Sequence, residues 1–156
     1  MTPISASDDA LITTFGRLLE VQGRLERCLG ADLEARVGLP HSWFEVLVRL
    51  ARSPDGQLTM GVLAEQVTLT TGGVTRLIDR MEAAGYVQRV PCPTDRRVSY
   101  AALTDAGRAK LEEATPVHSA NLRSVFAAFS DEERQTLDAL LDRLRTVPRA
   151  DLATGQ

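Results

Sequence analysis

The sequence predicts a mainly α-helical protein that carries one small β-hairpin. Apolar side chains recur every three or four residues along most of the 156 residues, which is the period of amphipathic helices. Two short runs at residues 86–90 and 98–103 are instead rich in β-branched and aromatic residues, and they predict paired strands. The expected order along the chain is four helices, the hairpin and two further helices.

Composition restricts the class of protein. A chain of 156 residues, 44% of them hydrophobic, fits one domain, or a small domain with extra helices. The net charge of -3 excludes binding of nucleic acid through bulk positive charge. The two cysteines are too few for a disulfide framework and lack zinc-site spacing. We expect no metal and no cofactor. The absence of a signal segment or a long apolar run predicts a cytoplasmic protein outside the membrane.

Charge divides the chain into parts. Residues 1–36 carry four basic and six acidic side chains and residues 104–156 carry seven and nine, so each end has a net charge of -2. Residues 37–103 carry seven arginines against six acidic residues, a net of +1, and Arg89, Arg96 and Arg97 lie close together. We expect helical segments at 1–36 and 104–147, a central lobe at 37–103, and disorder at 148–156 and in about the first eight residues.

The first two helices are predicted from an apolar stripe and a capping pattern. The stripe of the first helix consists of Leu11, Phe15, Leu18, Leu25 and Leu29. Ser42 and Glu45 have the spacing of a capping box that starts the second helix. The inward residues of that helix are Val46, Leu47, Leu50 and Ala51. The sequence Ser-Pro-Asp-Gly at residues 53–56 predicts the turn that ends it.

Two short helices are expected next, and two longer ones after the hairpin. Thr59 is placed to cap a helix that ends near residue 67, and Thr70 or Thr71 to cap one that ends before Gly85. After the hairpin, Thr104 caps a helix in which Pro116 invites a kink, and Ser130 with Glu133 forms a capping box for the last one. The apolar face of the first of these two comprises Leu111, Ala114, His118, Leu122, Val125 and Phe129. The inward face of the second comprises Leu137, Leu140, Leu141 and Leu144.

The helix before Gly85 has two chemically different faces. Its core-facing residues, spaced i, i+3, i+4 and i+7, are Val74, Leu77, Ile78 and Met81. Its other side, set by about 100° of rotation per residue, carries Gly72, Thr75, Arg76, Asp79 and Arg80. Arginine can pair with guanine, threonine with a phosphate or a thymine methyl, and glycine lets the helix N-terminus approach a phosphate, so this face suits a DNA major groove. Asp79 is expected to orient a neighbouring arginine. A solvated face with a few arginines is the alternative.

The surrounding pattern favours the DNA-binding interpretation. A short helix, a tight turn and a second helix form a helix-turn-helix arrangement, and an arginine-bearing hairpin follows at once. Asp95, Arg96 and Arg97 lie in the loop of that hairpin, from which cations can reach a narrow minor groove. A solvated turn is the alternative for this loop.

From residue 8 to residue 147 the sequence resembles the MarR family of winged-helix transcription regulators. The matching segments are residues 43–47, 63–64, 73–87, 95–97 and 103–107. The resemblance implies that Arg97 enters the minor groove, that Asp95 holds it, and that Arg96 contacts a phosphate. The expected DNA-binding residues are Thr70, Thr71, Gly72, Gly73, Thr75, Arg76 and Arg80 in the recognition helix and Asp95, Arg96 and Arg97 in the wing.

The resemblance also implies a homodimer formed by the terminal helices. This agrees with apolar stripes at both ends that one small lobe could not bury alone. The two recognition helices would lie about 34 to 36 Å apart, which predicts a pseudo-palindromic double-stranded DNA operator. The acidic ends would repel the duplex while the arginines attract it, which restricts docking to one orientation.

Members of the family usually repress genes and release DNA when a small phenolic or aromatic carboxylate enters a cleft beside the dimer helices. The resemblance therefore implies a repressor with an aromatic effector. The candidate ligand residues are Arg17, Arg24, His41, Trp43, His118 and Asn121. Surface cations and core aromatic or histidine side chains are the structural alternatives for these positions.

Three other functions are alternatives to this one. A redox-sensing regulator would use Cys28 or Cys92, although Cys28 does not stand in the sequence context of the family's peroxide-sensing branch. An enzyme is disfavoured because hydrolase, metalloprotease and phosphate-loop motifs are missing. A helical protein-interaction adaptor would explain the apolar stripes but not the arginine-bearing hairpin.

Overall fold

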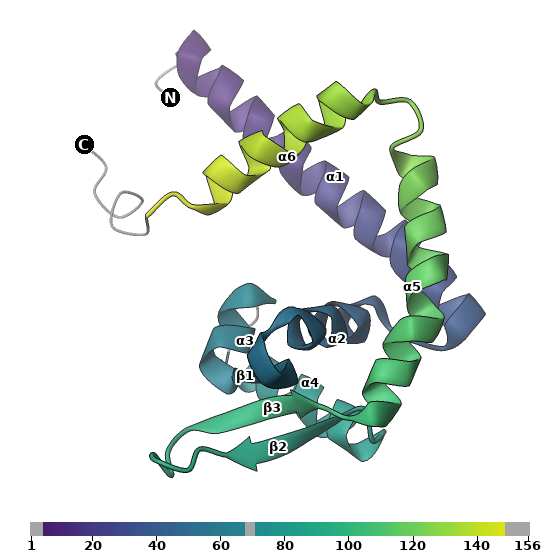
Figure 1. The fold of residues 1–156 in the computed structure, drawn as a ribbon. Coiled ribbons are helices and arrows are strands. Elements are labelled where there is room, and N and C mark those ends of the chain that lie inside the picture. The colour runs from purple at the N-terminus through teal and green to yellow at the C-terminus, as the bar shows by residue number, and fades with distance from the viewer. Residues whose placement is uncertain (1–4, 68–70, 149–156) are drawn as a thin grey trace. The chain divides into compact units, whose positions relative to one another are not determined.

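The computed structural model describes residues 5–67 and 71–148, and these residues form two compact units divided between His118 and Ser119. Figure 1 shows the helices and strands along the chain. They are α1 (Ala6–Val37), α2 (His41–Arg52), the 3-10 turn η1 (Pro54–Gly56), β1 (Gln57–Thr59), α3 (Met60–Gln66), α4 (Thr71–Ala83), β2 (Val87–Pro91), β3 (Ser99–Leu103), α5 (Asp105–Val125) and α6 (Asp131–Arg145).

An apolar core fills the first unit. It is formed by one face each of α2, α3 and α4, closed by Leu33 from α1 and by Ala101 from β3. The core-facing residues predicted for the helix before Gly85 are all buried: Val74, Leu77, Ile78 and Met81. Val46, Leu47 and Leu50 of α2 are fully buried as well, whereas Ala51 is half-buried. The amphipathic pattern of both helices is thus confirmed.

The predicted hairpin is present, but the sheet has a third strand. β2 and β3 pair in antiparallel fashion, with Val87 opposite Leu103 and Arg89 opposite Ala101. β1 pairs with the other edge of β3, which gives the strand order β1-β3-β2. The expectation of a two-stranded ribbon is therefore wrong by one strand. Three residues are too few to show the alternation that identifies a strand, and only their pairing with β3 defines them.

Three of the five predicted helix caps are confirmed. For the cap of α4, Thr70 lies outside the described residues and Thr71 is already the first helical residue. The hydroxyl oxygens of Thr59, Thr104 and Ser130 accept hydrogen bonds from backbone amides three residues further on, and Glu133 completes the capping box of α6. The predicted box of Ser42 and Glu45 is wrong. α2 begins at His41 with Pro40 as its N-cap, two residues before the predicted cap, and the Pro40 carbonyl accepts from the amides of residues 43 and 44. A capping side chain needs an extended backbone just outside the helix, and Ser42 is already inside it.

The ends of the terminal helices differ from the predictions. α1 begins at Ala6, so residues 6–8 are helical rather than disordered, and residues 149–156 of the expected disordered tail lie outside the described residues. α5 includes Pro116 and ends at Val125, before Phe129. The leucines of α6 that were expected to face inward are exposed: Leu137, Leu140, Leu141 and Leu144. No helix in the described ranges is both long and apolar enough to span a bilayer.

Hydrogen bonds join the start of α5 to the turn before β2. Gly85 has φ of 80°, the left-handed conformation of a helix stop. The Thr104 hydroxyl donates to the Gly85 carbonyl over 2.6 Å, and the Thr104 amide donates to the Tyr86 carbonyl over 3.2 Å. Gly107 packs so closely on this turn that an added Cβ would lie 2.0 Å from the Tyr86 carbonyl oxygen. Only glycine fits there.

Candidate nucleic-acid interface

The exposed face of α4 is the face that the sequence predicts. Its exposed side chains are Thr75, Arg76, Asp79 and Arg80. Arg76 lies along its own helix, with its Nε 3.3 Å from the Gly72 carbonyl oxygen. Gly72 is exposed and Gly73 is half-buried, at the start of the helix. Thr71 is the first residue of α4, whereas Thr70 lies outside the described residues. The helix thus presents small and cationic residues to solvent.

The loop between β2 and β3 holds the predicted pair of Asp95 and Arg97. The Arg97 Nε is 3.1 Å from Asp95 Oδ1 and its Nη2 is 3.2 Å from Asp95 Oδ2, while the Arg97 amide donates to Oδ1 over 3.0 Å. These bonds lower the pKa of Asp95, first through the Arg97 side chain and then through its backbone amide. The Arg97 side chain is nevertheless 90% exposed, and Arg96 beside it is exposed too. The hairpin therefore ends in two accessible cations, one of them oriented by a carboxylate.

Arg89, the third arginine of this stretch, is engaged elsewhere. Its guanidinium is 2.7 Å from Asp79 and 2.7 Å from Glu82, both on α4. The neighbouring arginine that Asp79 was expected to orient is therefore this one, from β2. The positive charge of the hairpin is carried by Arg96 and Arg97 alone.

Ring contacts are present at three of the predicted effector residues. His118 packs on Phe44 and His41, with ring centroids 4.6 and 5.6 Å away. Trp43 instead meets Tyr86 edge to face. Arg17 and Arg24 are exposed on α1, and Asn121 belongs to the second unit. The structure thus brings His41 and His118 together.

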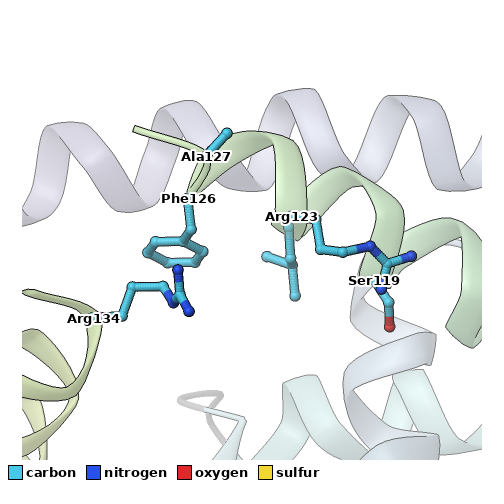
Figure 2. A pocket seen from close by; sticks show the side chains of 6 residues that line it. Ser119, Arg123, Phe126, Ala127 and Arg134 are labelled. Carbon is cyan, nitrogen blue, oxygen red and sulfur yellow. The ribbon is translucent and has the colours of Figure 1, made fainter. Parts of the chain in front are cut away.

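Two grooves lie among the described residues, one in each unit. The first, of about 380 Å³, is lined by α1, α2, the end of α3 and Leu77, and His41 is the only predicted effector residue in it. The second, of about 550 Å³, lies between the end of α5 and α6 (Figure 2). It is lined by Ser119, Leu122, Arg123, Phe126, Ala127 and Arg134. Sequence reasoning missed all six, because α5 was expected to continue through Phe129 and the groove forms only where the chain turns.

His118 predicts a pH-dependent stability. Burial, and then the nearby charge of His41, lowers its pKa against an opposing effect of Glu45. The unfolded chain therefore binds this proton more readily, so the free energy of unfolding should fall as the pH decreases below the ordinary histidine value of 6.5. Urea titrations at pH 7 and pH 5 measure this change. The free energy of unfolding should decrease less between the two pH values in His118→Leu than in the wild type. An equal decrease in both proteins would contradict this assignment.

The two cysteines are free and differ in their surroundings. Cys28 is exposed on α1, and Cys92 is half-buried in the hairpin loop. The Cys92 Sγ lies 3.3 Å from the Thr94 hydroxyl, and hydrogen bonds from Thr94 lower the pKa of the thiol. A lower pKa increases the fraction of Cys92 that is present as thiolate at a given pH.

The fold and this surface define a class of protein. A helix-turn-helix whose second helix exposes arginines, followed by a hairpin with a cationic tip, is a winged helix-turn-helix DNA-binding unit. Residues 37–98 match the model of the MarR family. The chain is 31% identical over 137 residues to the HTH-type transcriptional repressor YetL of Bacillus subtilis. These aligned residues cover 88% of this chain and 81% of that protein. The chain belongs to the MarR family of DNA-binding transcriptional regulators.

Solved structures agree with this assignment. Sco3205, a MarR family regulator from Streptomyces coelicolor in complex with DNA, superposes with a TM-score of 0.79 at 29% identity, over 93% of this chain and 90% of that one. A mutant of MarR from E. coli complexed with operator DNA gives a TM-score of 0.73 at 27% identity, over 85% and 94% of the two chains. The mainly helical fold with a small winged sheet is thereby confirmed.

Proposed function

We propose that the protein is a homodimeric repressor that binds a pseudo-palindromic operator and releases it when a small aromatic or phenolic molecule binds. The observation that carries the DNA-binding part is the exposed Arg97, held by Asp95 at the tip of the hairpin. A guanidinium oriented before binding loses less conformational freedom when it enters a minor groove. On the adjacent helix, Arg76 and Arg80 reach base edges or phosphates in the major groove. The repressor and operator parts are supported by similarity to YetL and to the MarR complex with operator DNA.

Apolar side chains on both terminal helices support the dimer. The exposed large apolar residues of α1 and α6 include Leu11, Ile12, Phe15, Leu19, Leu137, Leu140, Leu141 and Leu144. Phe15 is 60% and Leu144 is 56% exposed in the single chain. Monomeric proteins rarely leave such stripes in water, whereas a second copy of the chain can cover them.

The effector part is supported by the two grooves. In the second unit, Arg123 and Arg134 can pair with a carboxylate or a phenolate, and Phe126 offers a ring for stacking. In the first unit, His41 lies in a groove with an apolar floor of Leu25, Leu29 and Leu77. Each groove has room for a molecule of a single ring, although the smaller lies at the low end of ligand-site volumes.

Replacing Arg97 tests the DNA-binding proposal. Arg97→Ala should weaken binding to an operator fragment selected from genomic DNA by about 1 to 3 kcal/mol, because it removes the oriented cation from the minor groove. Fluorescence anisotropy at fixed salt measures this change. Arg36→Ala removes an arginine from a surface pair on α1, outside the proposed interface, and should bind like the wild type. Equal affinity of the Arg97 variant and the wild type would contradict the role of the hairpin.

A further inference from the structure

Two carboxylates lie on the exposed side of the proposed recognition helix, where a polyanion would repel them. Asp79 is 55% exposed and Glu82 is 40% exposed. They are three residues apart, so their side chains lie on the same side of α4. Phosphates nearby would disfavour both carboxylates unless a cation neutralised them. The cation that meets both is Arg89 of β2.

Arg89 of β2 contacts three positions along α4. Its Nη2 is 2.7 Å from Asp79 Oδ1, its Nη1 is 2.7 Å from Glu82 Oε2, and its Nη2 also donates to the Thr75 carbonyl over 3.4 Å. The Arg89 amide adds a fourth bond, to Glu82 Oε1 over 2.9 Å. Residues 75 to 82 span about 10 Å of helix, so the bonds restrain both the rotation and the sliding of α4 against the strand.

The ion pairs of Arg89 are less exposed to solvent than an ordinary surface ion pair. The Arg89 side chain is only 28% exposed. Its bonds lower the pKa of Glu82, first through the Arg89 amide and then, against desolvation, through the guanidinium. The planar guanidinium can bond two carboxylates at fixed angles, which the single ammonium of a lysine cannot do. The contact therefore depends on the shape of Arg89 and not only on its charge.

We propose that Arg89 is a positioning residue for operator binding, which sets α4 at a fixed distance and angle from the β2–β3 hairpin and offsets one of the two negative charges of Asp79 and Glu82 without itself contacting DNA. The inference rests on the proposed function, in which α4 and the hairpin enter adjacent grooves of one duplex. Because Arg89 fixes the two elements relative to each other, both enter the DNA grooves without rearranging. The conformational entropy of ordering them is then lost when the protein folds rather than when it binds DNA.

A lysine substitution separates this role from a direct phosphate contact. Arg89→Lys keeps the positive charge but loses the forked contact, and Arg89→Gln loses both. We expect both variants to bind the selected operator about 5- to 20-fold more weakly than the wild type. Their dependence of log affinity on log salt should keep the wild-type slope, because no phosphate contact is lost. Arg96→Ala, at the exposed tip of the hairpin, should reduce that slope by about 1 and serves as the matched control.

A double substitution tests whether Glu82 acts through Arg89. If it does, Arg89→Gln/Glu82→Gln should bind no more weakly than Arg89→Gln alone, since the second change breaks no further contact and removes a carboxylate that phosphates would repel. Circular dichroism and thermal unfolding of every variant check that the fold is retained at the temperature of the titration. Wild-type affinity of Arg89→Lys, a slope reduced by about 1 in Arg89→Gln, or additive losses in the double variant would each overturn the proposal. Unchanged binding of Arg97→Ala and Arg96→Ala would instead overturn the proposed function on which it rests.

Discussion

Aspartate at residues 140 and 144 of α6 is expected to convert the protein to a monomer and to weaken operator binding by at least about 100-fold. Leu140 is 53% and Leu144 is 56% exposed in the single chain, and both belong to the apolar stripe assigned to the dimer. Two carboxylates in that stripe would be buried without partners in a dimer, which strongly disfavours association. Each half-site would then be bound by an independent monomer, without the effective concentration that links the two lobes.

The comparison needs a variant with the same added charge on the other side of the helix. Gln135→Asp/Ala139→Asp provides it, because residues 135 and 139 lie on the face of α6 opposite to residues 140 and 144, and both are exposed. Sedimentation velocity measures the oligomeric state, and anisotropy with a full operator and with one half-site measures binding. A Leu140→Asp/Leu144→Asp variant that sediments as a dimer, or a control that dissociates as readily, would refute the assignment of this surface.

Gly107→Ala is expected to lower the free energy of unfolding by about 3 kcal/mol. The new Cβ would lie 2.0 Å from the Tyr86 carbonyl oxygen and 2.9 Å from the Leu103 side chain. The first of these atoms belongs to the backbone at the turn into β2, so it cannot rotate away. The start of α5 would have to separate from this turn, at the expense of the two Thr104 bonds that join them.

Gly61→Ala is the matched control, since it adds the same methyl group to a helical glycine. Outside its own helix backbone and chain neighbours, no atom of the described residues lies within 4 Å of a Cβ at Gly61. Alanine restricts the unfolded chain and favours the helix, so the free energy of unfolding of this variant should rise by about 0.4 to 1 kcal/mol. The midpoints of the urea titrations of the two variants should therefore shift in opposite directions from that of the wild type. A Gly107→Ala protein as stable as the wild type would show that the contact can relax.

Most of the candidate DNA-contacting surface could be predicted because the exposure of its residues depends on local pattern. The period of Val74, Leu77, Ile78 and Met81 decides which side of α4 is buried, and hence which side meets solvent. The pairing of Asp95 with Arg97 involves residues two apart, within reach of any tight loop. The role of Arg89 could not be predicted, because its partners lie seven and ten residues earlier, on another element.

The residues of the candidate effector grooves were harder to predict for the same reason. A groove collects side chains from several elements, and no short pattern records which ones meet. His41 and His118, 77 positions apart in the sequence, pack together only because α2 and α5 are neighbours in the first unit. Arg123 and Arg134 line a groove because α5 ends at Val125, whereas the apolar spacing indicated a helix continuing through Phe129.

The amino-acid sequence by itself determined the helices, most of their caps, the hairpin and the buried face of α4, since hydrophobic periodicity and capping act over a few residues. Tertiary structure alone decided that β1 joins the sheet, that Gly107 must lack a side chain and that Arg89 turns towards α4. Each of these depends on atoms that distant parts of the chain bring within hydrogen-bonding or van der Waals distance, and no local interaction encodes that proximity.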